Sequence, residues 1–235
     1  MQIASYIDHT ILKPTTTHIE IKKICEEALF YKFAAVCVPP SLVSLAKGQL
    51  SGSPVKTATV IGFPFGYSVI KAKLAEAEQA ISDGADELDM VINLVALKEG
   101  DWEWLEKEGS AITDLAHSEG KIVKMIIESG VLTGEEIVLC CRLYGGIGVD
   151  FVKTSTGYGF VKGADGRYSY KGATDHDLVL MRKYSALEVQ IKAAGGIRTL
   201  DDVLRVKALG VTRIGATATA AIIEDATKRF AQTVA

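Results

Sequence analysis

The sequence predicts a single α/β domain folded as a (β/α)8 TIM barrel, and three observations support this. Short apolar runs alternate with segments of helical periodicity throughout the 235 residues, a pattern typical of a parallel sheet covered by helices. Eight such units can be counted at roughly 29 residues each, which matches the size of one barrel. No linker, low-complexity stretch or charge run divides residues 1–235. An open, doubly wound sheet is the alternative arrangement of the same units.

Each expected strand is a short apolar run, and each expected helix has a start or stop signal. The strands are a segment ending near Asp8-His9-Thr10, residues 34–38, 56–61, 87–93 and 121–128, a strand containing Lys153, a strand containing Lys192, and residues 212–215. The helices are residues 19–31, 41–50, 71–83, 102–119 and 134–145, a segment starting near Thr174, and residues 200–209 and 219–231. Thr15 to Thr17 provide caps for the first helix, and Gly84, Gly120 and Gly210 close three others.

Composition excludes several classes of function. A net charge of −3 and a pI near 5.9 argue against nucleic acid or an anionic membrane as the main partner. No apolar run reaches the ~20 residues of a membrane span, and residues 1–8 lack the features of a signal peptide, so a cytoplasmic protein is expected. The 4 cysteines form no CxxC motif, and the adjacent Cys140 and Cys141 are unsuited to a disulfide. No cluster of acidic residues and histidines occurs, so we expect neither a metal nor another cofactor.

Two of the expected strands carry a lysine within an apolar run. Lys153 lies in the segment Asp150–Gly159 and is followed by hydroxyl residues and glycines, and Lys192 lies in Gln190–Ile197 with two glycines after it. Lysine is almost never fully buried without a partner, although a single strand-end lysine can extend its amine to water. The repetition of the pattern favours a function that brings the two lysines together.

Side-chain alternation places these lysines inside the predicted barrel. In residues 87–93, Leu88 and Met90 share an apolar face while Asp89 lies on the opposite one, and the neighbouring strands repeat this division. Because helices cover the outside of a barrel, the apolar faces point outward. Four titratable side chains therefore point inward: Asp89, Lys124, Lys153 and Lys192. Asp89 and Glu128 are the expected counter-charges, and a buried ion-pair network without chemistry is the alternative.

Glycines after the last two strands indicate a phosphate site. Gly195-Gly196 follow the Lys192 strand, and Gly215 follows the last strand. Barrel enzymes often bind phosphate with backbone amides of these loops, near the N-terminus of a short helix. The same glycines, with Gly157, would also suit tight strand-to-helix turns that bind nothing.

Six stretches give the chain a resemblance to a known family. They are Tyr6–Thr10, Thr59–Pro64, Gly84–Asn93, Phe151–Gly157, Lys192–Thr199 and Arg213–Thr217. The chain resembles the deoxyribose-phosphate aldolases, class I enzymes that split 2-deoxy-D-ribose 5-phosphate into acetaldehyde and D-glyceraldehyde 3-phosphate. The resemblance implies a Schiff base on Lys153, with Lys192 as the second lysine and Asp89 as the proton-transfer residue. It also implies substrate contacts from Asp8, Lys124, Thr156, Gly157, Gly195, Gly196, Gly215 and Thr217.

This assignment has a physical basis, since an amine attacks a carbonyl only when it is unprotonated. Burial and a cationic Lys192 would lower the pKa of Lys153 from its usual ~10.4. The substrates would be a small phosphorylated sugar and acetaldehyde, without nucleic acid or membrane, and we expect a homo-oligomer, a dimer or a tetramer.

Two departures from the family pattern concern the phosphate loop and residues 160–171. Thr217-Ala218 replaces a serine pair found in many members. Residues 160–171 are longer than the usual connection in bacterial relatives, and Asp165-Gly166 favours a two-residue turn between segments of strand character. We therefore expect a β-hairpin insertion at 160–171 at the catalytic mouth. It would serve as a lid or phosphate clamp using Lys162, Arg167 or Lys171, or as a structural element only.

Three other functions fit parts of the pattern. A barrel aldolase or transaldolase for another sugar phosphate would not use acetaldehyde as donor. An isomerase or epimerase would need a carboxylate or metal base in place of two lysines. A sugar-phosphate binder without catalysis would form no covalent adduct when borohydride is added.

Overall fold

A computed structural model describes residues 3–231, and within them eight parallel strands close into a barrel. The strand order is β1-β10-β9-β6-β5-β4-β3-β2, so β1 closes the barrel against β10. The barrel strands are β1 (Ile7–Thr10), β2 (Ala35–Val38), β3 (Lys56–Ile61), β4 (Glu87–Val91), β5 (Ile122–Ile126), β6 (Phe151–Lys153), β9 (Gln190–Ala194) and β10 (Arg213–Ala216). The predicted TIM barrel is confirmed, and the open sheet is excluded.

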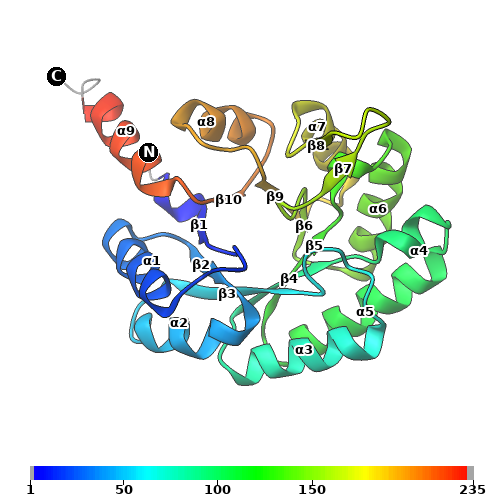
Figure 1. Cartoon of the computed structure of the whole chain (residues 1–235), viewed down its shortest axis with the longest axis horizontal. Helices are drawn as coiled ribbons and strands as arrows, with labels where there is room; N and C mark the ends of the chain where they lie inside the picture. Colours follow the sequence, from blue (N-terminus) through cyan, green and yellow to red (C-terminus); the bar gives the residue numbers. More distant parts are fainter. Residues whose placement is uncertain (1–2, 232–235) are drawn as a thin grey trace.

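Helices surround the barrel on the outside (Figure 1). They are α1 (His18–Tyr31), α2 (Val43–Gln49), α3 (Ile70–Ser82), α4 (Leu94–Lys98), α5 (Trp102–Ser118), α6 (Gly134–Ile147), α7 (Asp175–Tyr184), α8 (Leu200–Ala208) and α9 (Thr219–Ala231), with short 3-10 turns η1 (Ala4–Tyr6), η2 (Pro40–Leu42) and η3 (Ser129–Val131). None of the helices between residues 3 and 231 is long and apolar enough to cross a membrane.

Threonine caps begin several helices, and the sequence indicated the first of them, among Thr15 to Thr17. Thr17, Thr133 and Thr199 each form a capping box, in which the threonine accepts from a backbone amide and an acidic side chain three residues later returns a bond. Thr174 caps α7 by accepting from the amide of Asp177.

Helix α4 was not predicted, and two strands are shorter than expected. The strand predicted over 87–93 ends at Val91, because Asn93 accepts from the amides of Val95 and Ala96 and so begins α4. The strand predicted over 121–128 ends at Ile126. At Glu128 the backbone is left-handed (φ 52°), which no strand can continue.

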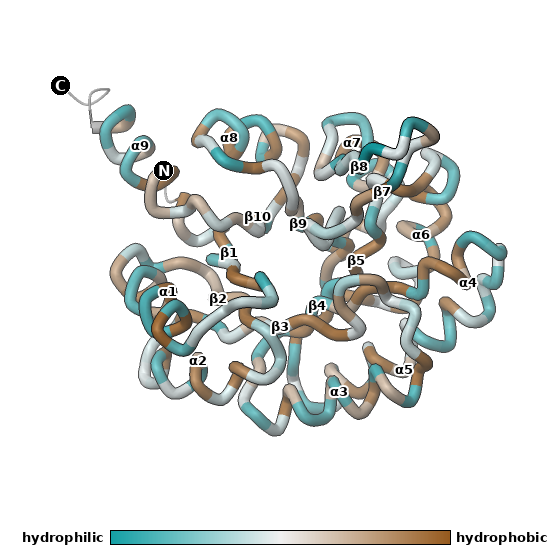
Figure 2. Tube along the Cα trace, viewed as in Figure 1, coloured by the Kyte–Doolittle hydropathy of each residue, from teal (hydrophilic) through white to brown (hydrophobic). Residues whose placement is uncertain are grey.

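The two faces of the strands have different surroundings. Apolar side chains such as Leu88, Met90 and Val123 point outward and pack in one large core against the helices. Figure 2 shows hydrophobic residues along the strands and hydrophilic residues on the outer turns of the helices. Inside the barrel, β2 and β3 contribute small apolar side chains, among them Cys37 and Ala58. The charged side chains come from the other strands.

An antiparallel hairpin lies within residues 160–171. Its strands are β7 (Phe160–Lys162) and β8 (Tyr168–Tyr170). The expected two-residue turn is wrong, because the Gly163 amide donates to Arg167 O at 2.8 Å and leaves a three-residue loop. Gly166 closes that loop in the left-handed region (φ 77°), where glycine is favoured.

Candidate active site

Asp89 lies at the centre of the charged side chains inside the barrel. Its Oδ1 accepts from Lys124 at 2.7 Å, and its Oδ2 accepts from both Lys153 and Lys192, each also at 2.7 Å. The alternation of β4, β5, β6 and β9 therefore brings all four predicted residues together. Lys153 and Lys192 are direct register partners on neighbouring strands, so they lie side by side at the same level.

Three further residues complete this network. Asp8 pairs with Lys192 and with Arg213, each at 2.5 Å, and Glu87 pairs with Lys124 at 2.6 Å and with Arg213 at 2.8 Å. We call the seven residues Asp8, Glu87, Asp89, Lys124, Lys153, Lys192 and Arg213 the charged network. Sequence reasoning did not select Glu87 or Arg213, although Glu87 shares the inward face of β4 with Asp89 and would have been found by asking for more counter-charges.

The charged network holds one more potential cation than carboxylate. Its four basic side chains are Lys124, Lys153, Lys192 and Arg213, and its three carboxylates are Asp8, Glu87 and Asp89. An unbalanced charge inside a protein is costly, so the least stabilised proton is readily lost. Lys153 contacts one carboxylate, whereas Lys192 and Arg213 each contact two and Lys124 contacts three. The proton of Lys153 is the one that the network holds least strongly.

The pKa shifts agree with this ranking. Burial lowers the pKa of Lys153, Asp89 opposes that effect, and the charge of Lys192 lowers the pKa further. Burial also acts on Lys192, but Asp8 and Asp89 outweigh it and hold the pKa of Lys192 above its ordinary value. Burial acts against the ionised form of Asp8 as well, yet Lys192 and Arg213 lower its pKa to about 2. Lys153 therefore gives up its proton more readily than Lys192.

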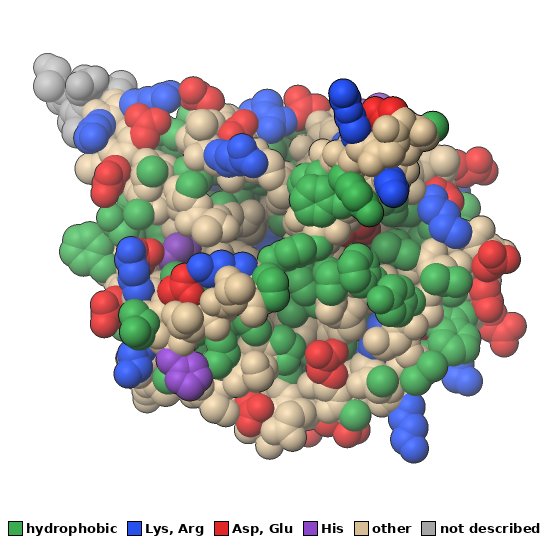
Figure 3. Space-filling model, in the orientation of Figure 1, with side chains coloured by type: hydrophobic (Ala, Val, Ile, Leu, Met, Phe, Trp, Pro, Cys, Tyr) green, Lys and Arg blue, Asp and Glu red, His purple; other side chains and the backbone are tan. Residues whose placement is uncertain are grey.

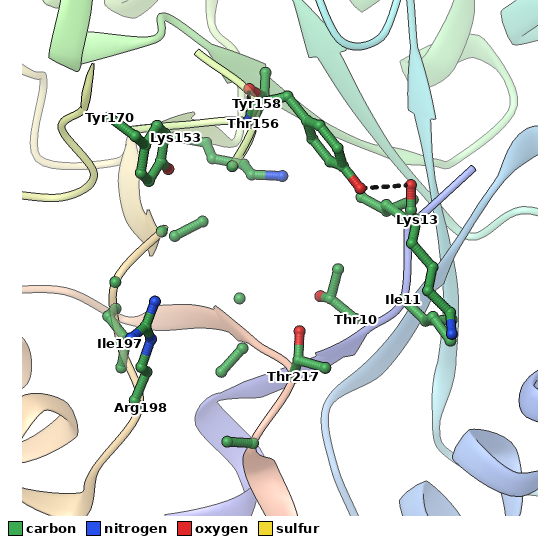
Figure 4. A pocket seen from close by; sticks show the side chains of 18 of the residues that line it. Thr10, Ile11, Lys13, Lys153, Thr156, Tyr158, Tyr170, Ile197, Arg198 and Thr217 are labelled. Atoms are coloured by element: carbon green, nitrogen blue, oxygen red, sulfur yellow. Dashed lines mark hydrogen bonds between the residues drawn. The ribbon is translucent and has the colours of Figure 1, made fainter. Parts of the chain in front are cut away.

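Lys153 opens into a cavity of about 680 Å³ at the mouth of the barrel (Figure 4). The cavity is also lined by the predicted residues Thr156, Gly157, Gly195, Gly196, Gly215 and Thr217. The other predicted residues, Asp8, Asp89, Lys124 and Lys192, are buried and do not line it. They contact Lys153 or one another beneath the cavity.

One end of the cavity has the features of an anion site. Gly195 and Gly196 both have a left-handed backbone (φ 83° and 85°), directly before the capped N-terminus of α8. Arg198 contributes a cationic side chain near them, whereas Lys13 lies across the cavity and pairs with Glu20 (Figure 4). At Gly215 a Cβ would lie 3.3 Å from the Cβ of Ala194, so the backbone approaches the Lys192 strand closely there. These groups together suit a phosphate.

Glu128 does not act as the expected counter-charge. Its Oε2 accepts from the amide of Thr156 at 3.1 Å and from the Thr156 hydroxyl, and it forms no ion pair with a lysine in the described part of the chain. Burial raises the pKa of Glu128, while its hydrogen bonds with Thr156 and the charge of Lys153 lower it by less. Its left-handed backbone at the end of β5 turns the side chain toward the loop after β6.

Two other expectations concern metals and surface charge. Residues 3–231 contain no group of three or more His, Cys, Asp or Glu side chains placed to hold a metal ion, and all four cysteines are buried free thiols. On the face shown in Figure 3, Lys and Arg are interspersed with Asp and Glu around a hydrophobic middle. That face has no continuous basic surface of the kind that binds nucleic acid.

Comparison with known proteins places this site in a family. A family model described as DeoC/LacD family aldolase matches residues 2–221. The chain belongs to this aldolase family. A deoxyribose-phosphate aldolase of Caldicellulosiruptor saccharolyticus is 46% identical over 225 residues, covering 95% of this chain and 98% of the relative. One from Thermococcus gammatolerans is 47% identical over 228 residues, covering 96% and 97%.

A solved structure agrees with these relatives. The DeoC/LacD aldolase fold seen here superposes on a deoxyribose phosphate aldolase of Aeropyrum pernix with a TM-score of 0.84. The two are 30% identical, and the match covers 94% of this chain and 89% of the other. That enzyme is described as a tetramer of unique structure.

Proposed function

We propose that this aldolase reversibly cleaves 2-deoxy-D-ribose 5-phosphate into acetaldehyde and D-glyceraldehyde 3-phosphate through a Schiff base on Lys153. The observation that carries the proposal is the contrast between the lysines. Lys153 opens into the cavity and has a lowered pKa, while Lys192 and Lys124 are enclosed and have raised ones. The names of the relatives support the choice of substrate.

The reaction begins when the neutral Lys153 amine adds to the C1 aldehyde of the open-chain sugar. Loss of water gives an iminium, which withdraws electrons from C2. In cleavage the C3 hydroxyl loses its proton, the C2–C3 bond breaks, and its electron pair forms the enamine of acetaldehyde. Glyceraldehyde 3-phosphate leaves with C3 as its aldehyde. Protonation at C2 and addition of water then release acetaldehyde and restore Lys153.

The phosphate would bind at the glycine end of the cavity. Backbone amides of Gly195, Gly196 and Gly215 would surround its oxygens, with the Thr217 hydroxyl as a further donor. Thr156 lies beside Lys153 in the cavity (Figure 4), and it and Gly157 would contact the sugar. This arrangement holds the phosphate away from the reacting carbons C1 to C3 and fixes the orientation of those carbons over the Lys153 amine.

Lys192 and Asp89 have distinct roles in this proposal. Lys192 stays protonated and keeps the proton off Lys153. Asp89 balances both lysines and fixes their separation, and it can exchange protons with the substrate only through a water, because both its oxygens accept from lysines. No cofactor is required. A cytoplasmic homo-oligomer remains the prediction, with the tetrameric relative in its favour.

Borohydride trapping tests the proposal. Enzyme treated with acetaldehyde and borohydride should carry an ethyl group on Lys153, located by peptide mass spectrometry. An ethyl group on Lys192 or Lys124 would reverse the assignment. If no adduct forms, the result favours a binding protein or an isomerase over an aldolase. Release of acetaldehyde from 2-deoxyribose 5-phosphate, measured with alcohol dehydrogenase and NADH, separates this function from that of an aldolase with another donor.

A further inference from the structure

His9 joins three segments of the chain around the loop that precedes α9. It follows Asp8 on β1, and strand alternation points its side chain outward, toward the helices. There Nδ1 lies 2.9 Å from the hydroxyl of Thr219, at the start of α9, and Nε2 lies 2.7 Å from a carboxylate oxygen of Glu27 on α1. The ring packs against Phe33, and only 3% of His9 is exposed. One side chain thus connects β1, α1 and α9.

The chemistry of the three groups determines the direction of both hydrogen bonds. A carboxylate only accepts, so Nε2 of His9 carries a proton and donates to Glu27. Burial lowers the pKa of His9, although Glu27 opposes this effect, and the neutral ring is favoured. Nδ1 of that neutral ring has a free lone pair and accepts from the Thr219 hydroxyl. Because Thr219 is fully buried, its hydroxyl depends on His9 for a partner.

Thr219 comes directly after the loop that carries two of the expected phosphate ligands. These ligands, Gly215 and Thr217, line the cavity of about 680 Å³ (Figure 4). Strands β1 and β10 are paired, with His9 opposite Ala216. The chain is therefore held at Ala216 by the sheet and at Thr219 by the His9 side chain. Residues 217 and 218 connect these two fixed points.

Packing alone does not hold residues 217 and 218 in place. Both are exposed, and both also line a second cavity, of about 410 Å³, which adjoins the first. His9, Glu27 and Ala220 belong to the lining of this second cavity. A loop that is free to move must be ordered when a ligand binds, and this ordering lowers the affinity. The hydrogen bond between Thr219 and His9 restricts that freedom.

We propose that His9 is a positioning residue, which through Thr219 holds the loop before α9 in the conformation in which Gly215 and Thr217 bind the phosphate. This inference rests on the proposed function, because it concerns the phosphate end of the same substrate. His9 does not line the cavity that Lys153 opens into. It therefore acts on the affinity for phosphorylated ligands and leaves the chemistry at Lys153 unchanged.

Thr219→Val tests the proposal, with Thr219→Ser as the matched control. Valine has the shape of threonine without the hydroxyl, whereas serine keeps the hydroxyl that donates to His9. Thr219→Val should raise KM for 2-deoxyribose 5-phosphate on the order of 10-fold, with little change in kcat. The inhibition constant of inorganic phosphate should rise by the same factor, while kcat/KM for unphosphorylated 2-deoxyribose should stay at the wild-type value. Thr219→Ser should match the wild type in each measurement.

Two variants of His9 test the same contact from its other side. Asparagine places an amide oxygen near the position of Nδ1, so His9→Asn keeps an acceptor for Thr219 but does not reach Glu27. Glutamine places its amide near the position of Nε2, so His9→Gln reaches Glu27 and loses the contact with Thr219. His9→Gln should therefore raise KM for the phosphorylated sugar as Thr219→Val does, and His9→Asn should not. If Thr219→Val lowers the melting temperature, this pair decides, since each of its members loses one hydrogen bond.

Several outcomes would overturn the inference. Equal losses with the phosphorylated and the unphosphorylated sugar, or a fall in kcat alone, would leave Thr219 only a structural role. Equal KM values for His9→Gln and His9→Asn would show that the contact with Thr219 does not position the loop. If the wild type does not cleave 2-deoxyribose 5-phosphate, the proposed function itself fails. Calorimetry with inorganic phosphate then tests the inference separately, and an equal Kd in the wild type and Thr219→Val would refute it.

Discussion

Replacing Lys192 by leucine should raise the pKa of Lys153 and move the acid limb of the activity profile to higher pH. Both amines lie 2.7 Å from the same Asp89 oxygen, so they are at most twice that distance apart, about 5.4 Å. At an effective dielectric of about 20, two unit charges at that separation repel by about 3 kcal/mol. This corresponds to about 2 pKa units. In Lys192→Leu the repulsion is gone, and Asp89 still favours protonated Lys153.

The sign of the effect follows from the protonation state that the chemistry needs. In the proposed mechanism Lys153 acts as a neutral amine, so activity should fall as the pH drops below its pKa. A higher pKa moves that loss toward neutral pH. At a pH low enough that Lys153 is mostly protonated in the wild type and in the variant, Lys192→Leu should have roughly 1% of the wild-type fraction of neutral Lys153. Its rate should fall by the same factor. The fold should persist, because three cations then balance the three carboxylates of the charged network.

The assay is the pH dependence of kcat/KM, which reports ionisations of the free enzyme. Lys73→Met is a matched control, because Lys73 is also fully buried and pairs with Glu108 at 2.7 Å on the outside of the barrel. We expect it to lower the melting temperature without moving the acid limb. An unmoved acid limb in Lys192→Leu would refute the electrostatic account of Lys153.

Three other predictions concern the hairpin, the phosphate loop and metals. Replacing residues 161–170 by a short glycine linker should raise KM for the phosphorylated sugar and lower kcat, whereas unchanged steady-state kinetics would leave the hairpin a structural role only. Gly195→Ala should loosen the hairpin, detected as faster tryptic cleavage at Arg167, because the added methyl group collides with the Tyr170 hydroxyl. Gly196→Ala has equal backbone strain and no such collision, so its hairpin should resist trypsin like the wild type, and equal cleavage of both variants would contradict the contact. Activity should survive dialysis against EDTA, and a loss restored by added divalent cations would disprove the metal-free mechanism.

The barrel could be predicted because its signals are local and repeated. Alternation within β4, β5, β6 and β9 determines which side chains point inward, and helix caps such as Thr17 and Thr199 are readable from short motifs. The ends of β4 and β5 were not predictable in this way. They depend on Asn93 capping a helix of only five residues and on a left-handed Glu128, and neither feature leaves a periodic signal.

The site was predictable to the level of its inward lysines, but the partners of those lysines were not. Arg213 lies on β10 and pairs with Asp8 on β1, across the seam where the two ends of the barrel meet. Only closure of the sheet brings these strands together. Glu128 shows the reverse case, since parity placed it inward near the lysines, whereas the turn after β5 directs its carboxylate to Thr156.

Closure of the barrel also explains how two lysines in equivalent positions come to differ. Lys153 and Lys192 are register partners with the same inward orientation, and both contact Oδ2 of Asp89. The asymmetry comes from Asp8, which reaches Lys192 because β1 is separated from β9 only by β10. One carboxylate on a distant segment thus gives Lys192 a second counter-charge and leaves Lys153 with one. The proposed division of labour between a charged Lys192 and a nucleophilic Lys153 therefore depends on strand order rather than on either lysine's own segment.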